Sequence, residues 1–113
     1  MSEVESADIQ ARLRAIAARA RKASAAEALP VDAARFVRQY YAQAEPEELA
    51  ERPAALAAAA LDHLRWAAER QPGRAKVRVF NPVAAEHGYT SERTVIETVN
   101  DDMPFLVDSL TMT

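Results

Sequence analysis

The sequence predicts a mainly helical protein whose last third becomes the start of an α+β unit. Alanine-rich stretches with larger apolar residues at three- and four-residue steps fill the chain up to about residue 73, which is the spacing of helices with one buried face. Two segments, 76–80 and 93–99, are rich in β-forming residues instead. We therefore expect an N-terminal helical domain over residues 1–73 and the beginning of a second domain, with the order strand, loop, strand and helix, over residues 74–113.

Four helical segments are expected in the first domain. The first spans about residues 6–23, and the second follows Asp32, a residue type that caps helices, and ends near residue 44. Prolines at the first turns of the next two segments fit a short helix over 47–51 and a longer one from Pro53 to about residue 70. The predicted core residues are Leu13, Ile16, Phe36, Tyr40, Leu61 and Leu64.

The second domain begins with the two predicted strands, which are separated by a loop over residues 81–92. After the second strand, Asp102 fits a helix cap and Pro104 fits the first helical turn. A helix is therefore expected over the last ten residues.

Composition excludes several classes of function. The net charge of −3 gives no general basis for binding nucleic acid. A local run of five cations between Arg12 and Lys22 fits a solvated helix face, with contact to a membrane or nucleic acid as the alternative. The chain has no cysteine, no apolar run of about twenty residues and no apolar leader after Met1. We expect a cytoplasmic protein without a membrane or nucleic-acid partner.

Residues that could carry chemistry are few. His63, in an alanine-rich helix, is expected at the surface or its boundary, and His87 beside Glu86 in the loop is expected to be solvated. Neither has enough neighbouring ligands for a metal. With only two glycines there is no glycine-rich turn that could hold a dinucleotide. We predict no catalytic, metal-binding or cofactor-binding residue in this chain.

The last forty residues carry a specific resemblance. The segments are V-R-V-F-N-P at 77–82, E-H-G at 86–88 and above all V-N-D-D-M-P-F-L-V-D-S at 99–109. They resemble the N-terminal region of the large bacterial NAD-dependent glutamate dehydrogenases. Within that family the region is similar to the opening of an ACT-like regulatory module, a β-α-β-β-α-β unit.

The resemblance implies a position for regulatory residues. Residues 102–107 are similar to the ACT turn Asp-x-Pro-Gly-Leu-Leu, but Phe105 replaces the glycine. A bulky side chain there removes the close backbone approach that glycine gives to an amino-acid effector, so packing between domains is favoured over effector binding. The structural or regulatory candidates are Asp101, Asp102, Pro104 and Phe105.

The resemblance also implies a function. The parent protein would use NAD to oxidise L-glutamate to 2-oxoglutarate and ammonium, with its catalytic residues outside this chain. The chain itself would be a regulatory or assembly segment that contacts the rest of its polypeptide and the other subunits of a homo-oligomer. Two alternatives remain at this point: a stand-alone helical interaction module, and an amino-acid-sensing ACT-like domain.

Overall fold

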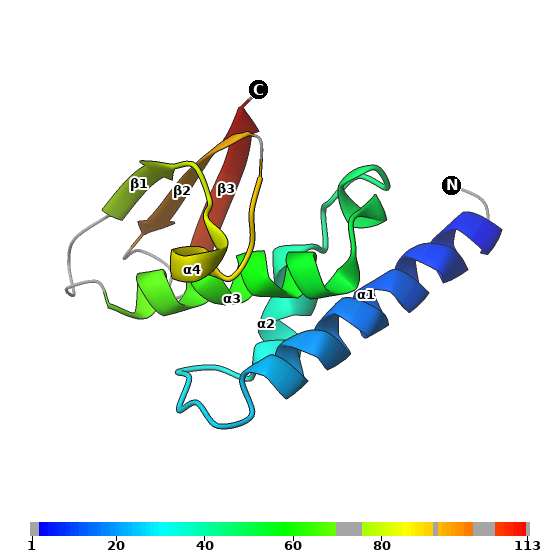
Figure 1. Cartoon of the computed structure of the whole chain (residues 1–113). Coiled ribbons are helices and arrows are strands. Elements are labelled where there is room, and N and C mark those ends of the chain that lie inside the picture. The colour runs from blue at the N-terminus through cyan, green and yellow to red at the C-terminus, as the bar shows by residue number, and fades with distance from the viewer. Residues whose placement is uncertain (1–2, 70–75, 92, 101–105, 113) are drawn as a thin grey trace. The chain divides into compact units, whose positions relative to one another are not determined.

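The computed structural model describes residues 3–69, 76–91, 93–100 and 106–112 (Figure 1). The chain divides into two compact units, Met1–Leu61 and Asp62–Thr113, and α3 (Pro53–Ala68) runs from the first into the second. The domain limits predicted from the sequence, 1–73 and 74–113, stay a prediction.

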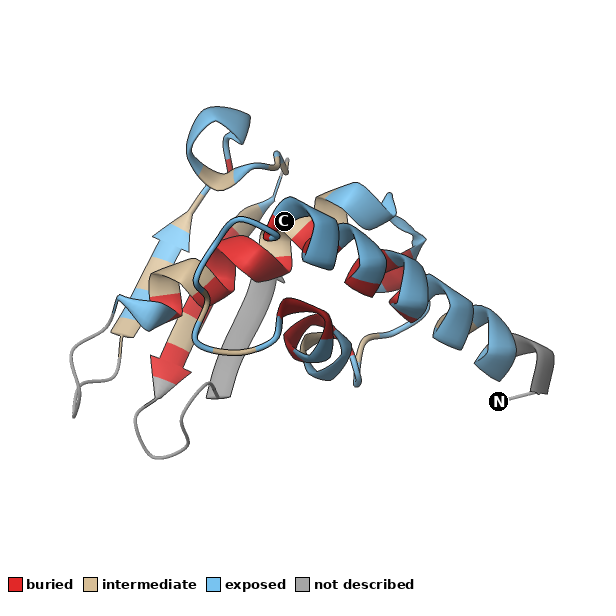
Figure 2. Ribbon diagram, turned by 90° about the horizontal axis from the view of Figure 1, so that it is seen from below, coloured by how far each residue is buried: buried red, intermediate tan, exposed pale blue. Residues whose placement is uncertain are grey.

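The first unit is helical, as predicted. It contains α1 (Glu3–Ala23), α2 (Ala33–Tyr40), the 3-10 turn η1 (Glu48–Ala50) and the first half of α3. One stripe of α1 is buried at helical spacing, and α1 packs against α2 (Figure 2). The buried residues of this stripe are Leu13, Ile16, Ala17 and Ala20. The five cations between Arg12 and Lys22 are all exposed, and the interpretation as a solvated helix face stays a prediction.

Polar contacts fix the ends of these helices. Asp32 caps α2, as predicted, because its carboxylate accepts a hydrogen bond from the backbone N–H of Arg35 at 2.9 Å. The Tyr41 hydroxyl donates to the carbonyl oxygen of Leu56 at 2.7 Å, which ties the end of α2 to α3. All the predicted core residues are buried except Tyr40, which is half-buried.

The second unit contains a three-stranded antiparallel sheet of β1 (Lys76–Phe80), β2 (Thr94–Asn100) and β3 (Leu106–Met112), in the order β1-β2-β3 (Figure 1). The first two strands lie where the sequence predicted them. The loop between them contains a four-residue helix, α4 (Ala84–His87), which ends at Gly88. Gly88 has a φ of 81°, a left-handed conformation that glycine adopts without steric cost.

The two faces of the sheet differ in burial. Val95, Glu97 and Val99 of β2 alternate along the strand and are buried on one face. On β1 the side chains of Val77 and Val79 point to the other face and are 62 % and 61 % exposed. Among the side chains described, β2 therefore buries one side of the sheet, and β1 exposes two valines on the other.

The predicted C-terminal helix is wrong over residues 106–112, which form β3 instead. Those seven residues pair with β2 from Asn100↔Leu106 to Thr94↔Met112, and this ladder outweighs the local helix signals. The two signals themselves, Asp102 and Pro104, lie outside the described residues. The pairing places β2 in the centre of the described sheet, between β1 and β3.

Candidate functional site: a buried charged cluster

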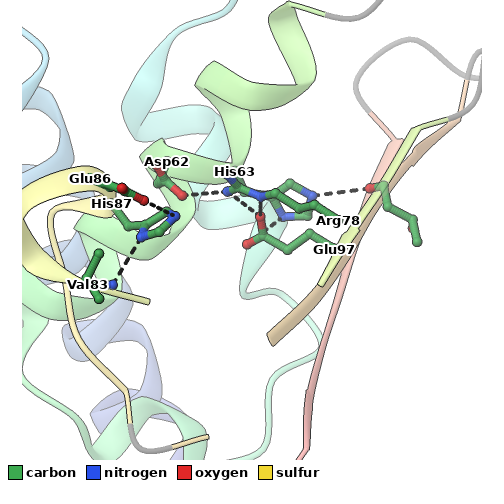
Figure 3. A network of polar contacts seen from close by, with 8 residues as sticks. Asp62, His63, Arg78, Val83, Glu86, His87 and Glu97 are labelled. Atoms are coloured by element: carbon green, nitrogen blue, oxygen red, sulfur yellow. Dashed lines mark hydrogen bonds and ion pairs between the residues drawn. The ribbon is translucent and has the colours of Figure 1, made fainter. Parts of the chain in front are cut away.

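Four polar side chains of the second unit form one cluster, which we call the Arg78 cluster: Asp62, His63, Arg78 and Glu97 (Figure 3). Arg78 is half-buried and the other three are buried. Arg78 lies at its centre. Its Nε donates to Oε1 of Glu97 at 2.6 Å, and its Nη2 donates to Oδ2 of Asp62 at 2.5 Å and also contacts Oε1 of Glu97. One guanidinium group thus pairs with two carboxylates.

Sheet register and helix position bring these residues together. Arg78 and Glu97 are directly opposite each other in the β1–β2 ladder, so their side chains leave the same face of the sheet. Asp62 and His63 are consecutive residues of α3, and the imidazole Nε2 of His63 lies 3.2 Å from the carbonyl oxygen of Thr98. The cluster therefore fastens residues of α3 to β1 and β2 at once.

Aromatic rings surround the guanidinium group. The Cζ atom of Arg78 lies 4.9 Å from the ring centre of Trp66 and 4.2 Å from that of Phe80. Lys76 places its ammonium group 5.1 Å from the Trp66 ring centre. Cations at these distances are attracted by the faces of aromatic rings.

Burial changes the protonation of two members of the cluster. Glu97 is 1 % exposed, and its removal from water raises its pKa to about 7 although Arg78 favours the charged form. His63 is fully buried, and the same effect lowers its pKa to about 4, against the hydrogen bond to Thr98. Burial also raises the pKa of Tyr89, with the negative charge of Glu97 as the second cause.

The cluster is internally satisfied. Among the described residues, every buried side-chain nitrogen or oxygen atom has a hydrogen-bond partner. In the same part of the chain, no group of three or more histidine and carboxylate residues could hold a metal ion, and no helix is long and apolar enough to cross a membrane. This arrangement is suited to holding elements together, because its polar atoms are directed at one another and not at a ligand.

The structure describes some of the residues singled out from the sequence and leaves others outside the described ranges. Asp101, Asp102, Pro104 and Phe105 lie outside the described residues, so their assignment as regulatory candidates stays a prediction. The expectation that His63 lies at the surface is wrong, because the residue is fully buried. Its contacts with Thr98 and Glu97 of β2, which are remote in sequence, help to compensate for the loss of water around the ring.

His87 and Glu86 form a separate, more open group. The Nδ1 atom of His87 accepts a hydrogen bond from the backbone N–H of Val83 at 3.0 Å, and its ring lies 4.5 Å from that of Phe80, centre to centre. Glu86 is exposed and approaches the ring only to 4.0 Å. The expectation that His87 is solvated is therefore wrong, because its side chain is only 13 % exposed and packs against Phe80, whereas Glu86 is solvated.

Arg78 and Glu97 were missed as functional residues, although the sequence carries a signal for them. Glu97 alternates with Val95 and Val99, so a carboxylate shares the strand face of two valines. Such a position requires a cation if the face is buried. Arg78 occupies the matching inward position of the neighbouring strand, between Val77 and Val79.

The model of the family "Glutamate dehydrogenase, ACT1 domain" matches residues 36–113 of the chain. The matched residues include the whole Arg78 cluster. The chain belongs to this family. The matched region begins within α2, so it contains α3 and the sheet. It also includes the last forty residues, on which the resemblance to this family is based.

Two similar proteins are NAD-specific glutamate dehydrogenases. The protein of Halomonas elongata is 41 % identical over 76 residues, and that of Pseudomonas aeruginosa is 33 % identical over 78 residues. These alignments cover 66 % and 68 % of this chain but only 5 % of each relative. No solved structure is significantly similar to the chain.

Proposed function

We propose that this chain is the N-terminal regulatory and assembly segment of an NAD-dependent glutamate dehydrogenase and holds none of its catalytic groups. The observation that carries the proposal is the ACT1 match over residues 36–113, together with relatives named as NAD-specific glutamate dehydrogenases. The complete enzyme would convert L-glutamate, NAD and water to 2-oxoglutarate, ammonium and NADH in the cytoplasm, as a step of amino-acid catabolism.

Two observations support a non-catalytic role. Hydride transfer from glutamate needs a site for the dinucleotide, and the usual glycine-rich turn cannot be built from Gly73 and Gly88 alone. The charged residues that are buried together in the second unit are occupied with one another. NAD would accordingly bind to a part of the enzyme outside these residues.

The sheet supports a role in assembly. Val77 and Val79 are more than half exposed, and β1 is an edge strand of the sheet that the structure describes. Apolar side chains that remain exposed, and strand edges with unpaired backbone groups, are surfaces on which proteins associate. The partners we propose are the remainder of the same polypeptide and the other subunits of a homo-oligomer.

The test is an assay of the isolated chain. We expect no formation of NADH from glutamate and NAD at any protein concentration, and no saturable change in NADH fluorescence when the chain is titrated into the dinucleotide. The complete enzyme serves as the positive control in both measurements. NADH production above the no-enzyme background, or saturable binding, would overturn the assignment of catalysis to other residues.

A further inference from the structure

His87 and Val83 are joined by two hydrogen bonds that run in opposite directions. The Nδ1 atom of His87 accepts from the backbone N–H of Val83 at 3.0 Å, and the backbone N–H of His87 donates to the carbonyl oxygen of Val83 at 2.8 Å (Figure 3). Val83 is the N-cap residue of α4, and its own side chain makes no capping hydrogen bond. The imidazole therefore does what the glutamate of a capping box does, because it reaches back to the N–H of the cap residue.

This hydrogen bond requires one protonation state of the ring. A neutral imidazole has one N–H group and one acceptor nitrogen, whereas a protonated imidazole has two N–H groups and no acceptor. Because Nδ1 is the acceptor for Val83, the proton of the neutral ring is on Nε2, which lies 4.0 Å from Oε2 of Glu86. The bond from Val83 exists only while His87 is neutral.

Packing also holds the ring in place. The side chain of His87 is 13 % exposed, and its ring lies 4.5 Å from that of Phe80, the last residue of β1, at an interplanar angle of 31°. The ring of Tyr89 lies 6.5 Å away on an edge-to-face approach. A second proton on a ring held in this way would point at the N–H of Val83, so two donors would face each other.

The charged and titratable groups around the ring come from several elements. Glu86 of α4 has a solvated side chain, and burial raises the pKa of Tyr89, so its hydroxyl stays neutral in the range where histidines titrate. On β1, Arg78 lies against the Phe80 ring, and its charge is paired with the carboxylates of Asp62 on α3 and Glu97 on β2. His87 is the group whose own proton decides whether Val83 has its acceptor.

We propose that His87 is an acid-sensitive clasp of the turn over residues 83–88: the neutral ring holds the N–H of Val83, and protonation of Nδ1 releases it. Val83 is exposed, so its released N–H can turn to water. The N–H of Gly88 donates to the carbonyl oxygen of Ala84 at 3.1 Å, and that bond does not involve the ring. Acid therefore loosens the start of α4 and leaves its end closed.

The test follows the exchange of single amide protons with water by nuclear magnetic resonance, corrected for the intrinsic effect of pH. The protection factor of the Val83 amide should fall by about two- to tenfold as the His87 ring is protonated, which is the effect of losing one ordinary hydrogen bond. The Gly88 amide is the internal reference and should change less. Constant protection of Val83, or an equal loss at Gly88, would overturn the clasp.

The form of the neutral ring is a separate check on the unsubstituted chain. Nitrogen-15 spectra should show the ring of His87 protonated on Nε2 and free of a proton on Nδ1 once its titration is complete. A neutral ring with its proton on Nδ1 could not accept from Val83 and would overturn the proposal.

Two variants assign the effect to one side chain. In His87→Gln the side chain does not titrate, so the protection of Val83 should no longer depend on pH. The matched control Glu86→Gln keeps the imidazole and removes the neighbouring carboxylate, so it should keep the fall. A fall that persists in His87→Gln, or that disappears in Glu86→Gln, would assign the effect to another group and contradict the clasp.

Discussion

Arg78 of β1 connects α3 and β2 through its guanidinium group. Its guanidinium group contacts carboxylates from α3 and β2 and lies over the rings of Trp66 and Phe80. Buried carboxylates are tolerated only when they are paired, and here one cation serves two of them. Loss of that cation leaves both without their compensating charge.

We expect Arg78→Ala to lower the free energy of unfolding by about 3–5 kcal/mol, the usual effect of removing one partner from a buried ion pair. Arg93→Ala, at an exposed arginine, is the matched control and should change it by less than about 0.5 kcal/mol. Urea unfolding of the three proteins measures both values. Equal stability of the two variants would show that the Arg78 cluster does not hold the second unit together.

At the level of elements, the first unit depends on a small core within alanine-rich helices. Leu61 is 1 % exposed near the middle of α3, whereas Leu56, one and a half turns earlier, is half-buried. The two leucines have the same chemistry in the same helix and differ in burial. They therefore provide a direct comparison of what burial contributes.

Leu61→Ala should destabilise the chain by about 2–5 kcal/mol, because it removes buried methyl groups and leaves a cavity. Leu56→Ala should cost clearly less, since its side chain keeps part of its contact with water in the folded state. Thermal unfolding followed by circular dichroism should rank the melting temperatures in this order. The reverse order would mean that the buried face of α3 is assigned incorrectly.

The same elements show what the sequence could predict. Helix positions followed from local signals, such as the cap at Asp32 and the first-turn proline Pro53, since these act within a few residues. The C-terminal strand β3 was missed because its formation depends on seven residue pairs with β2. Burial of His63 was missed for the same reason: its partners Thr98 and Glu97 are more than thirty residues away.

At the scale of the whole molecule, the family match bears on what the complete protein does, and the buried charges bear on what holds the second unit together. The ACT1 match relates the chain to glutamate dehydrogenases, while the alignments cover only 5 % of those relatives. The described residues use their buried charges to hold α3 to the sheet. Val77 and Val79 of β1 remain exposed, and they are the surface on which the proposed assembly would rest.

The central claim is that these residues assemble the enzyme and take no part in its chemistry. Sedimentation velocity tests both parts of this claim, the role in assembly and the absence of a role in chemistry. The complete enzyme and a version lacking residues 1–113 are each mixed with NADH and followed at a wavelength where only the reduced nicotinamide absorbs. We expect the shortened enzyme to sediment as a smaller assembly with NADH still bound to it. An assembly of the same number of subunits, or a folded protein from which NADH no longer co-sediments, would contradict the account.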